Sequence, residues 1–169
     1  MTNSTKLSCA LVILLLAFGP AKLFAGSASA SLSVTATVAN DCTVSTSALA
    51  FGSYEPIVTN ASTPMDGTGS VTITCTKGAT TTIGLDAGSN APGSGTTRAM
   101  LAGGVKLDYE IYKDSGRTTI WGNSGASLFT PPVAPNKNSR SFSVFGRIPA
   151  GQDVASGSYN DSVLATINF

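Results

Sequence analysis

Apolar and polar residues alternate along most of this chain, and this period of two constrains the fold more than any other feature. The clearest alternating runs are residues 69–76 and 106–112. Their predicted inward side chains are Val71, Ile73, Cys75, Leu107, Tyr109 and Ile111. The side chains between them, Glu110 among them, are predicted to face outward. Helical spacing at i, i+3 and i+4 is not sustained after the N-terminal apolar run. About seven short strands, separated by turns rich in Gly, Pro and Asn, predict an all-β sandwich.

The first 30 residues have the pattern of a secretory signal peptide. Lys6 precedes an apolar run over residues 7–18, which ends at Gly19 and Pro20. A membrane-spanning helix needs roughly 20 apolar residues, so a membrane anchor is the less favoured alternative. Small side chains place the cleavage between positions 25 and 30. We therefore expect residues 1–30 to be removed and the remainder to be exported.

The chain contains no histidine, and only 11% of its residues are charged. Histidine is the most frequent general base and the most frequent metal ligand in proteins. The sequence also has no acid/base pair of carboxylates and no glycine-rich phosphate loop before a helix. We therefore predict no enzymatic activity, no catalytic residues, no cofactor and no metal. No basic stripe remains after residues 1–30, so nucleic acid is not an expected partner.

Two cysteines, Cys42 and Cys75, remain after the predicted signal peptide, whereas Cys9 is removed with it. An even pair in an oxidising compartment predicts a disulfide. Closing that loop stabilises a folded chain by about 3 to 4.7 kcal/mol in the chain-entropy description. The alternative is a structural zinc site, which needs four Cys or His ligands where this chain offers two.

Strand patterns without an evident neighbour occur near both ends of the predicted domain. The first pattern places on one face Leu32, Val34, Ala36 and Val38. The last pattern, a predicted strand over residues 159–169, places on one face Val163, Ala165, Ile167 and Phe169. A sandwich whose final strand lacks a neighbour has an apolar groove and an unpaired edge, which is a template for another chain. Periodicity does not say which chain a strand pairs with, so residues 32–38 could instead be the first strand of their own domain.

Eight short motifs occur in a fixed order between about Ser31 and Phe169. They are FGSYEP at 51–56, VTITC at 71–75, GLDAG at 84–88, RAM at 98–100, LDYEIYKD at 107–114, WG at 121–122, GRIPAGQ at 146–152 and GSYND at 157–161. Together they resemble the spore coat protein U family, which includes the pilin subunits of archaic chaperone-usher pili in Gram-negative bacteria.

The resemblance implies an incomplete immunoglobulin-like β-sandwich, completed by a donor strand from a neighbouring subunit. It divides the exported chain into a donor-strand extension, residues 31–40, and a pilin domain, residues 41–169. By this resemblance the donor-strand residues are Leu32, Val34, Ala36 and Val38. The edge of the acceptor groove carries Val163, Ala165, Ile167 and Phe169, and the disulfide pairs Cys42 with Cys75. The donor register stays open, because Asn168 replaces the usual penultimate Tyr and Ala36 is the only small residue on the donor face.

The resemblance also implies partners and a location. The implied partners are a periplasmic pilus chaperone, an outer-membrane usher, and identical or related pilin subunits. The implied location is the periplasm and then a cell-surface fimbria that serves adhesion and biofilm formation. One alternative is a secreted spore-coat or matrix protein of the same fold. Another is a lectin-like or tip adhesin module, although a two-domain adhesin needs a further binding domain of about 100 residues.

Three isolated residues have predicted structural roles. Trp121 stands beside a turn, where packing is favoured over stacking on a ligand. Arg98 and Arg147 have no partner visible in the sequence, so we expect both on the surface, solvated or in ion pairs.

Overall fold

The computed structural model describes residues 25–91 and 98–169. It divides into two compact units, residues 1–36 and residues 37–169. In the first unit only residues 25–36 are described, and none of them lies in a helix or strand. The predicted signal peptide therefore lies mostly outside the described residues. No helix in the described ranges is long and apolar enough to cross a membrane.

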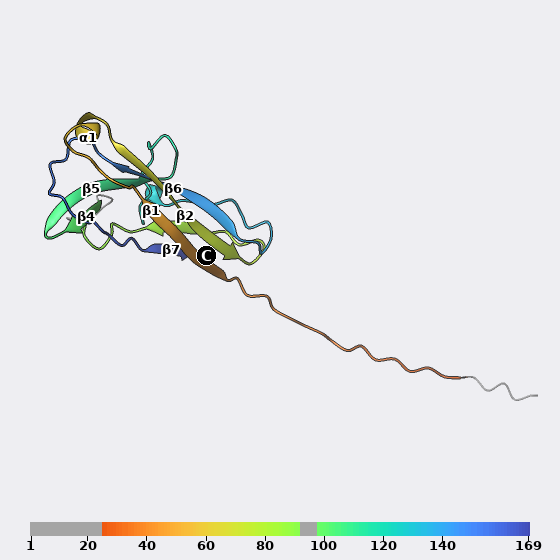
Figure 1. Cartoon of the computed structure of the whole chain (residues 1–169). Helices are drawn as coiled ribbons and strands as arrows, with labels where there is room; N and C mark the ends of the chain where they lie inside the picture. Colours follow the sequence, from red (N-terminus) through yellow and green to blue (C-terminus); the bar gives the residue numbers. More distant parts are fainter. Residues whose placement is uncertain (1–24, 92–97) are drawn as a thin grey trace, which may run out of the picture. The chain divides into compact units, whose positions relative to one another are not determined.

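The described part of the second unit contains seven short strands, as predicted, and very little helix (Figure 1). The strands are β1 (Cys42–Ala50), β2 (Met65–Cys75), β3 (Thr82–Leu85), β4 (Arg98–Ala102), β5 (Val105–Tyr112), β6 (Arg140–Ile148) and β7 (Ala165–Asn168). Five of them form one sheet in the order β1-β2-β6-β5-β4, and β3 pairs with β7 in a second sheet. All of these ladders are antiparallel. A short helix, α1 (Thr59–Ser62), precedes β2, and a 3-10 turn spans Gly125–Ser127.

The hydrophobic core draws side chains from both sheets. Its buried members are Val71, Ile73, Cys75, Ala79, Ile83, Leu85, Leu107, Tyr109, Ile111, Trp121, Ala134, Val144 and Ile148. All six inward residues predicted from the two alternating runs are in this set. Trp121 is fully buried and donates from Nε1 to the Ile83 carbonyl at 3.0 Å, which confirms the packing role.

Arg98 is fully buried, so the prediction of a surface arginine is wrong. Its Nη1 donates to Oε1 of Glu110 at 2.7 Å. The rest of the guanidinium donates to the carbonyl oxygens of Asp86, Leu85 and Trp121 at 2.8–3.0 Å. A buried charge is tolerated when it is paired and hydrogen-bonded in this way. Glu110, which was expected to face solvent, has a side chain only 17% exposed because it is the partner of this arginine.

Arg147, in contrast, lies on the surface as predicted. It pairs with Asp66, from Nε to Oδ1 at 2.8 Å and from Nη2 to Oδ2 at 3.0 Å. The hydrogen bond from Arg147 lowers the pKa of the Asp66 carboxyl. Both side chains are more than one-third exposed, so solvent screens the pair and its contribution to stability is small.

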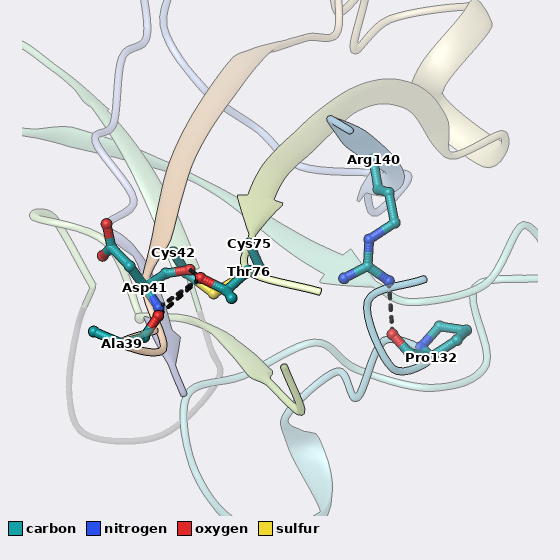
Figure 2. Close-up of a disulfide and its surroundings, with 7 residues drawn as sticks. All are labelled: Ala39, Asp41, Cys42, Cys75, Thr76, Pro132 and Arg140. Carbon is teal, nitrogen blue, oxygen red and sulfur yellow. Dashed lines mark hydrogen bonds between the residues drawn. A yellow bond between two sulfur atoms is a disulfide. The ribbon is translucent and has the colours of Figure 1, made fainter. Parts of the chain in front are cut away.

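A disulfide joins Cys42 and Cys75, as the sequence predicts (Figure 2). The two residues are direct partners across the β1–β2 ladder. The bond therefore fastens the first residue of β1 to the last residue of β2.

Replacing both Cys42 and Cys75 by alanine is expected to lower the free energy of unfolding by about 3–4 kcal/mol, because the unfolded chain loses its closed loop. Urea unfolding of the purified protein measures this loss. The parent protein under reducing conditions is the matched control, and it should unfold at the midpoint of the double variant. Equal midpoints for the oxidised parent and the double variant would contradict the prediction.

Candidate binding groove

The C-terminal segment, residues 159–169, is bonded to the rest of the second unit along one side. Its backbone pairs in turn with β4, with residues 86–89 and with β3. Asn160 exchanges two backbone bonds with Leu101, at 2.9 and 3.2 Å, and the Asp86 N–H donates to the Leu164 carbonyl at 3.1 Å. Within the described ranges no strand pairs with the opposite side of this segment. Its free backbone edge is therefore available to another strand.

The GLDAG motif holds this segment in place. Oδ1 of Asp86 accepts hydrogen bonds from the N–H groups of Leu164 and Gly88, both at 2.9 Å. Gly88 has a φ of +84°, and a Cβ at this position would overlap the carboxylate of Asp161. Both properties require glycine here.

Gly88→Ala is expected to destabilise the protein more than Gly78→Ala. Gly78 has a similar φ of +88°, but a Cβ there would meet no atom within 4 Å. In both variants the alanine must adopt a left-handed backbone conformation, which costs roughly 1–2 kcal/mol. Only Gly88→Ala must also displace Asp161, so its urea midpoint should lie clearly below that of Gly78→Ala. Equal midpoints would show that the close approach to Asp161 has no energetic consequence.

β1 is the second strand with a free edge. One of its edges pairs with β2, and its other edge has no strand partner in the described part of the chain. Seven of its nine residues are exposed, and only Cys42 and Leu49 are half-buried. The apolar/polar alternation did not predict this strand, because it is interrupted by the polar run 45–47 and the apolar run 48–50. β1 and β7 lie next to each other, so their free edges border the same gap.

An open groove occupies the gap between β1 and the C-terminal segment. It consists of a cavity of about 350 Å³ and a second cavity of about 550 Å³. The first has walls from residues 46–49 and 159–163. Core side chains form its floor, namely Val71, Leu85, Tyr109, Ile111 and Val144. Leu49, Phe51 and Met100 line both cavities, so the two are adjacent. The floor side chains are each 6% exposed or less, so the groove is a recess above a closed core.

Polar groups near the groove floor are paired with one another. The hydroxyl of Tyr109 donates to Oδ2 of Asp161 at 2.7 Å. Oδ1 of Asp161 accepts from the backbone N–H and the side-chain amide of Asn90, both at 3.1 Å. Burial and this carboxylate raise the pKa of Tyr109. Because these groups are satisfied by one another, they need no hydrogen-bond partner from a ligand.

The four predicted groove-edge residues do not all lie in the same environment. Val163, Ala165 and Ile167 are half-buried and pack against the core. Phe169 follows the end of β7 and is 53% exposed. The strand is also shorter than the predicted segment 159–169, since β7 covers Ala165–Asn168 only. Residue 160 bonds to Leu101 of β4, whereas residues 162 and 164 bond to Ser89 and Asp86 outside any strand, so no regular ladder forms there.

The four predicted donor residues are exposed, and none lies in a strand. Leu32, Val34 and Val38 are 86%, 84% and 82% exposed, and Ala36 is exposed as well. The expected strand over residues 32–38 is therefore not formed in the described chain. A single strand needs neighbours to be stable in water, so its absence is the physical consequence of its having no partner.

The described residues also hold no group of three or more His, Cys, Asp and Glu side chains suited to a metal ion.

Comparison with known proteins agrees with this geometry. A profile described as the Spore Coat Protein U domain matches residues 28–166. Protein U of Myxococcus xanthus is 38% identical over 169 residues, covering 92% of this chain and 91% of that protein.

A solved structure shares the fold. It is a chain in the crystal structure of the CsuC-CsuE chaperone-tip adhesion subunit pre-assembly complex from archaic chaperone-usher Csu pili of Acinetobacter baumannii. The TM-score is 0.57 at 25% identity, and the match covers 79% of this chain and 41% of that chain. The predicted all-β fold, similar to that of chaperone-usher pilus subunits, and the family resemblance are confirmed, and both the family and the fold are structural rather than enzymatic.

Proposed function

Since this chain belongs to the spore coat protein U family, we propose that it is the structural subunit of a surface pilus, assembled by donor-strand exchange. In this proposal the donor segment of one copy, residues 31–38, fills the groove of the next copy. A single observation carries the proposal: a recess floored by core side chains lies between two free strand edges, while an alternating apolar segment of the same chain is exposed.

The sizes of segment and groove are compatible. A seven-residue strand over 32–38 is about 23 Å long, and the nine residues of β1 offer a free edge of about 30 Å. Burying Leu32, Val34 and Val38 contributes roughly 1.5–3 kcal/mol each. Each backbone hydrogen bond to a free edge adds about 0.5–1.5 kcal/mol. These gains are large against a domain stability of about 5–15 kcal/mol, so a filled groove should make the fibre persistent.

Head-to-tail contacts explain why the product is a fibre. The donor segment and the groove are different surfaces of one chain, so each copy binds the next heterologously. Such contacts form open filaments when the rotation between copies does not close a ring.

The proposal includes the route to the surface. Residues 1–30 act as a signal peptide, a periplasmic chaperone covers the open groove, and an outer-membrane usher adds the subunit to the fibre. The similar Acinetobacter baumannii structure is a complex of a chaperone with a pilus subunit, which supports a chaperone partner here. The finished fimbria serves adhesion and biofilm formation.

A secreted coat or matrix protein of the same fold is the second candidate function. The description of the matched family as spore coat protein U, and the similarity to Protein U of Myxococcus xanthus, favour it. Such a protein would not need polymers that depend on a chaperone.

Expression in a Gram-negative periplasm, with and without residues 26–38, separates the two functions. The pilus function predicts ladders of polymers in unheated denaturing gels from the full chain, and none from the shortened chain. A soluble, cooperatively folding monomer from both chains would reject the pilus function and favour the coat or matrix protein.

A further inference from the structure

The connection between the donor segment and β1 is bonded to the second unit. The N–H of Thr76 donates to the Asp41 carbonyl at 2.9 Å, and the N–H of Asp41 donates to Oγ1 of Thr76 at 3.1 Å. The same hydroxyl lies 3.3 Å from the carbonyl oxygen of Ala39, to which it donates (Figure 2). Thr76 therefore holds both ends of the connection 39–41, which we call the clamped linker.

Neighbouring bonds make this end of the sandwich rigid. The disulfide joins the residues that adjoin the clamp, Cys42 and Cys75. Backbone bonds of 2.8 and 3.0 Å tie Ala134 to the turn after Thr76, through Gly78 and Ala79.

The loop that begins at Pro132 belongs to the same end. Nη1 of Arg140 donates to the Pro132 carbonyl at 2.6 Å (Figure 2). Val133 lies between two residues that are fixed in this way, yet its side chain is 55% exposed. This end thus exposes an apolar side chain on a backbone that is held by hydrogen bonds on both sides of Val133.

We propose that this end of the sandwich, formed by the clamped linker, Thr76 and Val133, is a contact surface for a second copy of the chain. The inference rests on the proposed function. If Val38 lies in the groove of a neighbour, the next residue, Ala39, is already bonded to its own sandwich. Consecutive Cα atoms are only about 3.8 Å apart, so no free linker separates the two sandwiches. The two sandwiches must therefore touch at this end, and the contact covers Val133 in the polymer. Thr76 is the positioning residue, because its hydroxyl bond to Ala39 keeps the linker against its own sandwich.

Thiol labelling of polymers tests this contact. Val133→Cys is prepared in the full chain and in a chain with Gly-Ser-Gly-Ser inserted between Asn40 and Asp41. Polymers of both are exposed to a maleimide. Ser115→Cys, at an exposed turn after β5, is the matched control in both chains. We expect labelling of the Val133→Cys thiol to be lost in the polymer and restored by the insertion, while Ser115→Cys is labelled equally in both.

Thr76→Val removes the hydroxyl that bonds to Ala39 and Asp41, and so tests the clamped linker directly. In the Val133→Cys chain it should restore part of the labelling, whereas Thr74→Val, two residues earlier in β2, should not. Full labelling of the Val133→Cys thiol in polymers of the uninserted chain would overturn the proposed contact while leaving donor-strand exchange intact. Absence of polymer ladders from the parent chain would overturn the proposed function, and this inference with it.

Discussion

Val34→Asp is expected to abolish polymer formation. Val34 is 84% exposed in the described chain, so the substitution should leave the sandwich itself unchanged. In a filled groove the side chain would face the apolar floor. Burying an unpaired carboxylate there costs several kcal/mol, and the roughly 1.5–3 kcal/mol from burying valine is also lost. Unheated denaturing gels should therefore show monomer only.

Thr35→Asp is the matched control, because it places the same charge one residue along the segment. Successive side chains of a strand point to opposite faces, so this charge should remain in solvent. Polymers of Thr35→Asp should resemble those of the parent. If Val34→Asp polymerised as well as Thr35→Asp, the face assigned to the donor strand would be wrong.

Arg98→Ala is expected to lower the free energy of unfolding by about 3–5 kcal/mol, because it leaves a buried partner charge without its counterion. The partner is Glu110, and three carbonyl oxygens also lose their donor. Two of these carbonyls, at Leu85 and Asp86, belong to β3 and to the residue after it. The loss should therefore loosen the strand that holds β7. Urea unfolding of the purified protein measures the loss, and a low periplasmic yield should accompany it.

Arg147→Ala tests the same chemistry at an exposed pair. Because its ion pair with Asp66 is screened by solvent, we expect a loss of less than about 1 kcal/mol. Similar losses for the two variants would contradict the structural role assigned to Arg98.

The sequence predicted the strands that have one face in the core and the other face toward solvent. Alternation identified the buried faces of β2 and β5, since each has one face in the core. It did not identify β1, because the alternation in this strand is interrupted at residues 45–50 and seven of its nine residues are exposed.

The buried arginine could not be predicted for a different reason. Most of its partners are backbone carbonyls, which every residue carries, so no side-chain pattern marks them. The pairing of Arg98 with Glu110 depends on the proximity of β4 and β5 in space. The GLDAG motif was visible in the sequence, but its role in holding Leu164 and accommodating Asp161 needed the structure.

The groove itself was predicted only in outline. The alternating pattern of residues 163–169 suggested one free edge, and the structure adds the second wall, β1, and the core side chains of the floor. Phe169 fits the sequence alternation, but it follows the end of β7 and is 53% exposed, so the pattern extends further than the buried strand.

Backbone amide exchange of residues 32–38 in the polymer is the most direct test of donor-strand exchange. These residues are outside any strand in the described chain, so their amides should exchange at coil rates before assembly. In the polymer we predict strong protection of residues 32–38, together with new protection along the free edges of β1 and the C-terminal segment. Coil-like exchange of residues 32–38 within intact polymers would contradict the account.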